Sequence, residues 1–281
     1  MELIFEPFKY AFFARALFVG LLLGLSCGVL GCFVVLRGMA FIGDALAHSI
    51  LPGMVAAYLF GLNIFIGAFI AGIVTALLIS GISRTEQVRE DSAIGIVFTG
   101  AFALGIVLIS RVQGYTRDLA HLMFGNILGV SPDDVLIVIL VTMVVLSVIA
   151  LWFREFILIS FDVIQARAIG LKINFLHLGL MMILSLAIVT GLQAVGVILV
   201  ASMLVTPAVT ARLLTDRLPV MIFLAAGFGC GSALIGLYLS YYMDVASGGA
   251  VVLTGTVIFV LAFLFAPKRG FLARRALVIR Q

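Results

Sequence analysis

Asp44 and His48 are ionisable side chains in the stretch GDALAHS, residues 43–49, whose surroundings are almost entirely apolar. At positions i and i+4 they share one face of a helix, about one turn apart. A carboxylate oxygen and an imidazole nitrogen together suit a divalent transition metal such as Mn²⁺, Zn²⁺ or Fe²⁺. Two ligands are too few for a closed site. A twofold dimer would supply both residues twice, and the four ligands would then meet on its axis.

Two other roles are open for this pair. Asp44 could cap the helix while His48 bonds to a backbone carbonyl, or the two side chains could relay a proton. The apolar surroundings favour a metal or proton role, because ionisable residues are costly inside a membrane and usually mark a functional site.

Other polar residues are weaker candidates. Asp118 and His121, at i and i+3, form a second possible metal pair, although Asp118 also suits a helix N-cap. Glu90 and Asp91 open an apolar segment, where negative charge favours a helix N-terminus, and His177 is expected at the membrane interface. Residues beside the pair, or interrupting a helix, could line the pathway or a gate: Arg37, Met39, Ser49 and Pro207.

The composition places these residues in an integral membrane protein. Of the 281 residues, 64% are hydrophobic and 11% are charged, and the mean hydropathy is +1.33, whereas about 25% of a soluble domain is charged. The apolar runs are long enough to cross a bilayer as helices, and no alternating barrel pattern is present. We therefore predict one all-α transmembrane domain over residues 1–281. Nine segments are expected, with eight as an alternative if one is a half-helix: 11–36, 44–60, 64–83, 92–110, 134–152, 175–191, 194–214, 219–243 and 250–266.

The distribution of Lys and Arg predicts the orientation. With nine spans and the N-terminus outside, 13 of the 17 basic residues fall in loops on the cytoplasmic side, as the positive-inside rule requires. The C-terminal tail, which is rich in Arg, is then inside. The net charge of +4 says little about nucleic acid, and no nucleic-acid partner is expected.

The longest connection expected on the cytoplasmic side is residues 153–174. Its centre, FDVIQARAIGLK, has the spacing of a short amphipathic helix that ends near Gly170. Such a helix could lie on the membrane surface or dock a cytoplasmic partner.

A weak internal repeat relates residues 24–49 to residues 191–214. In the predicted topology the first four segments and the last four would form an inverted pair around the fifth. Inverted repeats with interrupted helices are typical of transporters, and the interruptions indicate the binding site. Here LRGMAFIGD and LVTPAVT are the expected interruptions.

Several kinds of chemistry lack their motifs. The sequence contains no G-x-x-x-x-G-K-[ST] stretch for ATP, no H-E-x-x-H and no G-x-S-x-G. We therefore expect a protein that is not itself an enzyme and that has no permanently bound cofactor.

The chain resembles the membrane permease subunits of the bacterial manganese/zinc/iron ABC importers. The resemblance rests on five stretches in this order: VLRGMAFIGDALAHSILPG (35–53), EDSAIGIVFTGAFALGIVLIS (90–110), DLAHLMFGNILGV (118–130), ISFDVIQARAIGLKINFLH (159–177) and QAVGVILVASMLVTPAVTARLL (193–214).

The resemblance implies a fold like that of the vitamin B12-type importers, a homodimer in the bacterial cytoplasmic membrane, two cytoplasmic ATP-binding subunits and an extracytoplasmic metal-binding protein. The family's intramembrane Asp and His fall on Asp44 and His48. Manganese is the first choice of transported ion, with zinc and iron as alternatives. A coupling helix to the ATPase would lie at about 161–172, with these contact candidates: Phe161, Asp162, Gln165, Arg167 and Gly170.

Two functions of other classes remain open from the sequence. The chain could be a proton-coupled secondary carrier that uses Asp44 and His48 as the proton relay. It could also be a scaffold or receptor subunit that does not transport.

Overall fold

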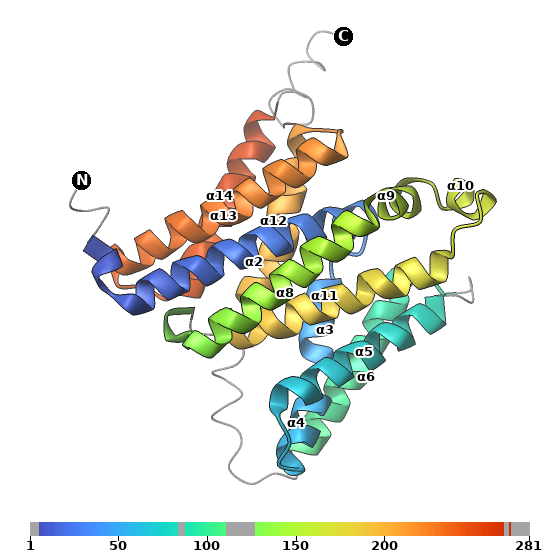
Figure 1. Ribbon diagram of the computed structural model, residues 1–281, viewed down its shortest axis with the longest axis horizontal. Coiled ribbons are helices and arrows are strands. Elements are labelled where there is room, and N and C mark those ends of the chain that lie inside the picture. The colour runs from blue at the N-terminus through green and yellow to red at the C-terminus, as the bar shows by residue number, and fades with distance from the viewer. Residues whose placement is uncertain (1–5, 84–87, 111–126, 267–269, 271–281) are drawn as a thin grey trace.

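The computed structural model describes residues 6–83, 88–110, 127–266 and 270, and this part of the chain is helical (Figure 1). Nine of its helical segments are long and apolar enough to cross a membrane, with α3 and α4 together forming one of them. They match the nine predicted segments to within four residues at each end. The elements are η1 (Glu6–Lys9), α2 (Ala11–Leu36), α3 (Ile42–Ser49), α4 (Leu51–Leu59), α5 (Ile64–Ser83), α6 (Glu90–Ile109), η2 (Ile127–Gly129), α8 (Pro132–Leu151), α9 (Phe153–Phe161), α10 (Val163–Ala168), α11 (Ile173–Val195), α12 (Val197–Leu214), α13 (Leu218–Met243) and α14 (Ser247–Phe265).

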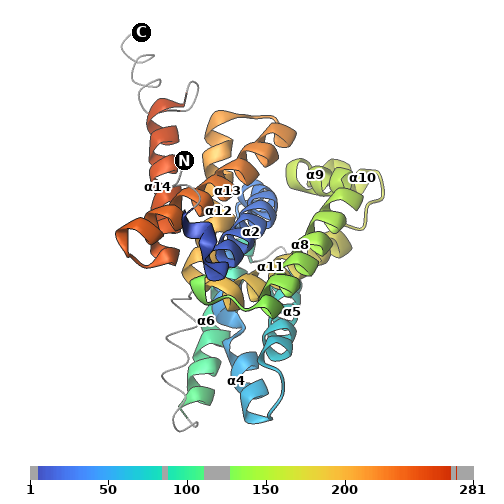
Figure 2. The same ribbon diagram turned by 60° about the vertical axis from the view of Figure 1, so that its left-hand side comes forward.

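Six of the membrane helices form two groups of three, which are separate in Figure 2. Helices α4, α5 and α6 pack against one another, and so do α12, α13 and α14. Helix α2 packs against α12 and α13 of the second group, whereas α11 packs against α5 of the first. Helix α8 contacts both α2 and α11. The first helix of each predicted half, α2 or α11, therefore packs against the group from the other half, and α8 lies between them. This arrangement fits the predicted inverted pair of four segments on either side of a central one.

Small residues allow α2 and α13 to pack closely together. A Cβ atom on Gly24 of α2 would lie 2.6 Å from the backbone carbon of Gly229 in α13, and one on Gly28 would lie 2.8 Å from the carbonyl oxygen of Ala225. Lipid tails are as apolar as leucine, so membrane helices associate through such close backbone packing. This contact fixes α2, whose far end leads into the helix that carries Asp44 and His48.

The first predicted interruption is confirmed. Residues 37–41 separate α2 from α3, and Gly38 has a φ of 75°, a conformation that suits glycine. The membrane segment is interrupted again at Ile50, between α3 and α4. Pro52 explains this second break, because proline has no N–H to donate to the carbonyl of His48.

The predicted interruption around Pro207 is wrong. Helix α12 continues from Val197 to Leu214 with Pro207 inside it. Membrane helices tolerate a proline inside them, and the only carbonyl that Pro207 leaves without its usual N–H partner is that of Met203, one turn earlier. The chain instead breaks between α11 and α12 at Gly196, whose φ is 94°.

The predicted helix at 161–172 is shorter than expected. Helix α10 spans only Val163–Ala168, because Asp162 accepts a hydrogen bond from the Gln165 N–H at 2.8 Å and so begins a new helix after α9. Gly170, with a φ of 83°, follows its end. Together α9 and α10 project from one end of the bundle (Figure 1).

Candidate functional site

Asp44 and His48 lie together on α3. The distance from His48 Nε2 to Asp44 Oδ1 is 3.5 Å. The helix is capped by Phe41 without a side-chain hydrogen bond, so Asp44 is not its N-cap. Asp44 instead lies in the first turn, where the helix dipole favours negative charge. The predicted side-by-side placement of the two side chains is therefore present, and the capping alternative is excluded.

The two side chains differ in exposure. The Asp44 side chain is 53% exposed and the His48 side chain is 18% exposed. The His48 ring packs against two aromatic rings of α6, with centroid distances of 5.8 Å to Phe98 and 5.2 Å to Phe102. These rings restrict the orientation of the imidazole. The carboxylate is the member of the pair that reaches open space.

This geometry suits part of a metal site. With metal–ligand distances of about 2.1 Å, a 3.5 Å separation of nitrogen and oxygen gives an angle of roughly 110° at the ion. Within the described ranges no group of three or more His, Cys, Asp and Glu side chains is placed to hold a metal ion. One copy of the chain, as far as the structure describes it, therefore brings together two side chains that could act as ligands.

The residues predicted to line the pathway are distributed around this pair. Ser49 is buried, follows His48 and lines an apolar groove of about 700 Å³ between α4, α5 and α6. Its hydroxyl has no hydrogen-bond partner among the described residues. Met39 is buried in the core, and Pro207 is buried in α12, which packs against α3.

Arg37 belongs to a second polar cluster, which the sequence did not reveal. Its Nη2 lies 3.8 Å from Oε2 of Glu90, and Oε1 of the same carboxylate lies 3.3 Å from Nε2 of His177. A polar pocket of about 280 Å³ adjoins these groups, and Arg167 also lines it. Burial lowers the pKa of the Arg37 guanidinium, and the charge of Glu90 partly opposes this shift. The guanidinium remains protonated.

One signal in the sequence hinted at this cluster. Arg37 follows the end of α2, Glu90 begins α6 and His177 is near the start of α11. In the predicted topology all three lie at the same membrane face. Which of these helix ends are neighbours depends on tertiary packing, so the sequence predicts only a helix-terminal charge at Glu90 and an interfacial residue at His177.

The predicted coupling residues are exposed. Phe161, Asp162, Gln165, Arg167 and Gly170 all lie at the surface of the segment formed by α9 and α10. Apolar side chains are exposed there too, with Ile164 at 85%. Ala166 is fully buried and anchors α10 to the rest of the protein. An exposed apolar surface of this kind is typical of a protein interface.

The remaining predicted metal pair, Asp118 and His121, lies outside the described residues.

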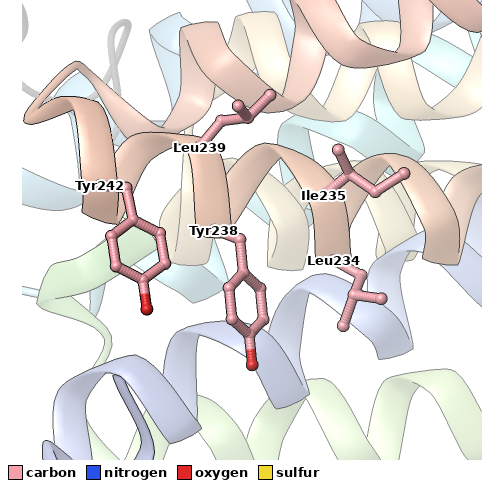
Figure 3. A pocket seen from close by; sticks show the side chains of 5 residues that line it. All are labelled: Leu234, Ile235, Tyr238, Leu239 and Tyr242. Atoms are coloured by element: carbon pink, nitrogen blue, oxygen red, sulfur yellow. The ribbon is translucent and has the colours of Figure 1, made fainter. Parts of the chain in front are cut away.

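The opposite end of the bundle is aromatic. Phe13 packs against Tyr241 at a centroid distance of 5.6 Å, and Tyr10 lies 6.3 Å from the same ring. A shallow groove of about 440 Å³ runs along α13, where Tyr238 and Tyr242 point the same way (Figure 3). It is lined by apolar and tyrosine side chains and contains no carboxylate or imidazole. Such residues are typical of the membrane–water interface.

Comparisons with known proteins agree with this architecture. Residues 9–266 match the model of the ABC 3 transport family. The chain is 50% identical over 266 residues to "Manganese transport system membrane protein MntC" of Halalkalibacterium halodurans, which covers 95% of this chain and 91% of that protein.

Two solved structures are also similar. One is PsaBC from Streptococcus pneumoniae in complex with Fab, with a TM-score of 0.85 and 38% identity over 100% of this chain and 99% of that one. The other is an inward-facing putative metal-chelate type ABC transporter, with a TM-score of 0.68 and 19% identity over 89% and 84% of the two chains. The second likeness concerns the fold alone. The family match over nearly the whole length settles the classification: this chain is a multi-pass membrane protein of the ABC 3 transport family.

Proposed function

We propose that the chain is the permease subunit of an ATP-driven importer that moves Mn²⁺ into the bacterial cytoplasm. The observation that carries the proposal is the Asp44–His48 pair, 3.5 Å apart on an interrupted membrane helix. It occurs in a chain that aligns over 95% of its length with a manganese transport protein. Zn²⁺ and Fe²⁺ remain alternative substrates, because the same ligand types accept them.

The complete site needs two copies of the chain. Asp44 and His48 supply two ligands, and their equivalents from a second copy would supply two more around a twofold axis. The half-exposed carboxylate of Asp44 supports this arrangement, since it faces space that the described part of its own chain leaves open. A shell of four protein ligands, completed by water, would hold the ion weakly enough to release it.

Transport would be driven by partner subunits. The permease sequence has no P-loop, so ATP is bound by two cytoplasmic subunits that dock on the segment formed by α9 and α10. A separate extracytoplasmic protein would deliver the ion. In the proposed orientation the N-terminus is outside, the C-terminus is inside, and ATP-driven closure of the subunits moves the two helix groups relative to each other.

Uptake of radioactive Mn²⁺ tests the site. We expect Asp44→Ala and His48→Ala to abolish uptake in cells where the transporter still assembles, whereas Asp91→Asn, a change at an exposed carboxylate, leaves it intact. Wild-type uptake in both site variants would contradict the assignment.

The dependence of Mn²⁺ uptake on the ATP-binding subunits tests the mechanism. Uptake into proteoliposomes should require the ATP-binding subunits and ATP. Uptake by the permease alone, driven by a proton gradient, would instead establish a secondary carrier. Ile164→Asp should release the ATP-binding subunits during purification, because it places a charge in the centre of the exposed apolar surface.

A further inference from the structure

A second carboxylate–imidazole pair is formed by Glu90 and His177. These residues are 87 positions apart in the sequence and come from different helices, α6 and α11. Their Oε1 and Nε2 atoms are 3.3 Å apart, which gives an angle of roughly 105° at an ion bound about 2.1 Å from each. Glu90 Oε1 is buried and makes no hydrogen bond to a described residue. The ligand types and their separation match those of the Asp44–His48 pair.

One ridge of side chains on α6 connects the two pairs. Glu90, Ile94, Phe98 and Phe102 follow one another at intervals of four residues and so form one ridge that winds slowly around the helix. Phe98 and Phe102 contact the ring of His48, and Glu90 contacts His177. At 1.5 Å per residue, Glu90 and Phe98 are about 12 Å apart along the axis. Ile94, which is 2% exposed, lies between them as an apolar barrier.

Arg37 distinguishes the second pair from the first. Its guanidinium lies 3.8 Å from the other oxygen of Glu90, so the carboxylate is shared between a cation and an imidazole. Arg37 also belongs to the short connection that leads into α3 and the Asp44–His48 pair. A divalent ion at Glu90 and His177 would compete with Arg37 for the carboxylate and be repelled by its charge.

We propose that Glu90 and His177 form a second binding site for the transported divalent cation, on the cytoplasmic side of the Asp44–His48 site. The ion passes Ile94, binds briefly to Glu90 Oε1 and His177 Nε2, and leaves when Arg37 pairs with the carboxylate again. The pocket lined by Arg167 is the route to the cytoplasm. The direction of passage rests on the function proposed above, whereas binding at this site can be measured without it.

The test uses the purified transporter, permease together with its ATP-binding subunits, in lipid nanodiscs. The permease carries Asp44→Ala and His48→Ala, so that only the second site remains, and equilibrium binding of Mn²⁺ is measured. Adding Arg37→Gln should tighten this residual binding by about tenfold, because a competing positive charge is removed. Adding Glu90→Gln or His177→Gln to that protein should weaken it by at least about tenfold. Arg89→Gln and Asp91→Asn, at exposed neighbours on the same helix end, are matched controls and should change nothing.

The outcomes separate the two proposals. Residual binding that does not respond to Glu90→Gln, or that does not tighten with Arg37→Gln, overturns the second site and leaves the first untouched. If these combined variants fail to assemble, Mn²⁺ is titrated into the otherwise wild-type transporter. Glu90→Gln should then remove one bound ion per permease copy at saturation, and an unchanged stoichiometry would contradict the proposal.

Discussion

The Asp44–His48 pair and the Glu90–His177 pair present the same two ligand types at nearly the same separation, 3.5 and 3.3 Å. They differ in what surrounds them. The first is local to one helix, has an aromatic wall and leaves its carboxylate half exposed. The second is assembled from two helices and has a guanidinium against its carboxylate.

In the proposed mechanism this difference would separate the holding of an ion from its release. At the first pair no described cation competes for Asp44, so a metal and a second copy of the chain can both approach it. At the second pair Arg37 already neutralises the acid, which makes any binding there weak. A pathway needs both properties, because an ion must enter favourably and still be able to leave.

The largest effect on Mn²⁺ uptake is expected from neutralising the carboxylate of each pair, Asp44 or Glu90, in separate variants. Asp44→Asn should reduce the initial rate of Mn²⁺ uptake by about 100-fold or more, because the only carboxylate of the pair is lost. Glu90→Gln should reduce it by about tenfold, since the ion still reaches the first site. Equal losses in the two variants would mean that the sites do not have the separate roles assigned here.

A smaller effect is expected on the stability of the folded transporter, because among the described residues only the second pair has a guanidinium, that of Arg37, beside its carboxylate. Glu90→Gln should lower the free energy of unfolding by about 1–3 kcal/mol, because the largely buried Arg37 guanidinium loses its partner. Arg37→Gln combined with Glu90→Gln should restore part of this loss, as expected for interacting residues. Thermal unfolding of the purified transporter measures both. Strictly additive effects would show that the ion pair contributes nothing.

The smallest effect is expected from the aromatic wall of the first site. Phe102→Ala removes a ring that packs on His48 at 5.2 Å and should weaken Mn²⁺ binding about threefold by freeing the imidazole. Phe223→Ala, at a side chain that is 79% exposed on α13, is the control. Equilibrium binding by the two variants compares them directly, and identical affinities would exclude a positioning role for Phe102.

The sequence predicted that the first pair of side chains lies together but not the second pair, for a physical reason. Helical periodicity places Asp44 and His48 on one face whatever the rest of the fold does, and the apolar runs predict the helices themselves. The contact between Glu90 and His177 depends on which helix ends become neighbours. Local signals also predicted an interruption at Pro207 that is absent, because α12 continues through it. The joint between the sixth and seventh segments, predicted at 192–193, lies a few residues later at Gly196, whose φ is positive.

The central claim is that His48, with Asp44, binds the transported ion. Pulsed electron paramagnetic resonance of substoichiometric Mn²⁺ bound to the purified transporter tests it most directly, because coupling to a histidine nitrogen identifies a ligand. We predict a nitrogen coupling in the wild type that persists in His177→Gln and disappears when His48→Ala is added to that variant. A coupling that survives in the double variant would contradict the account.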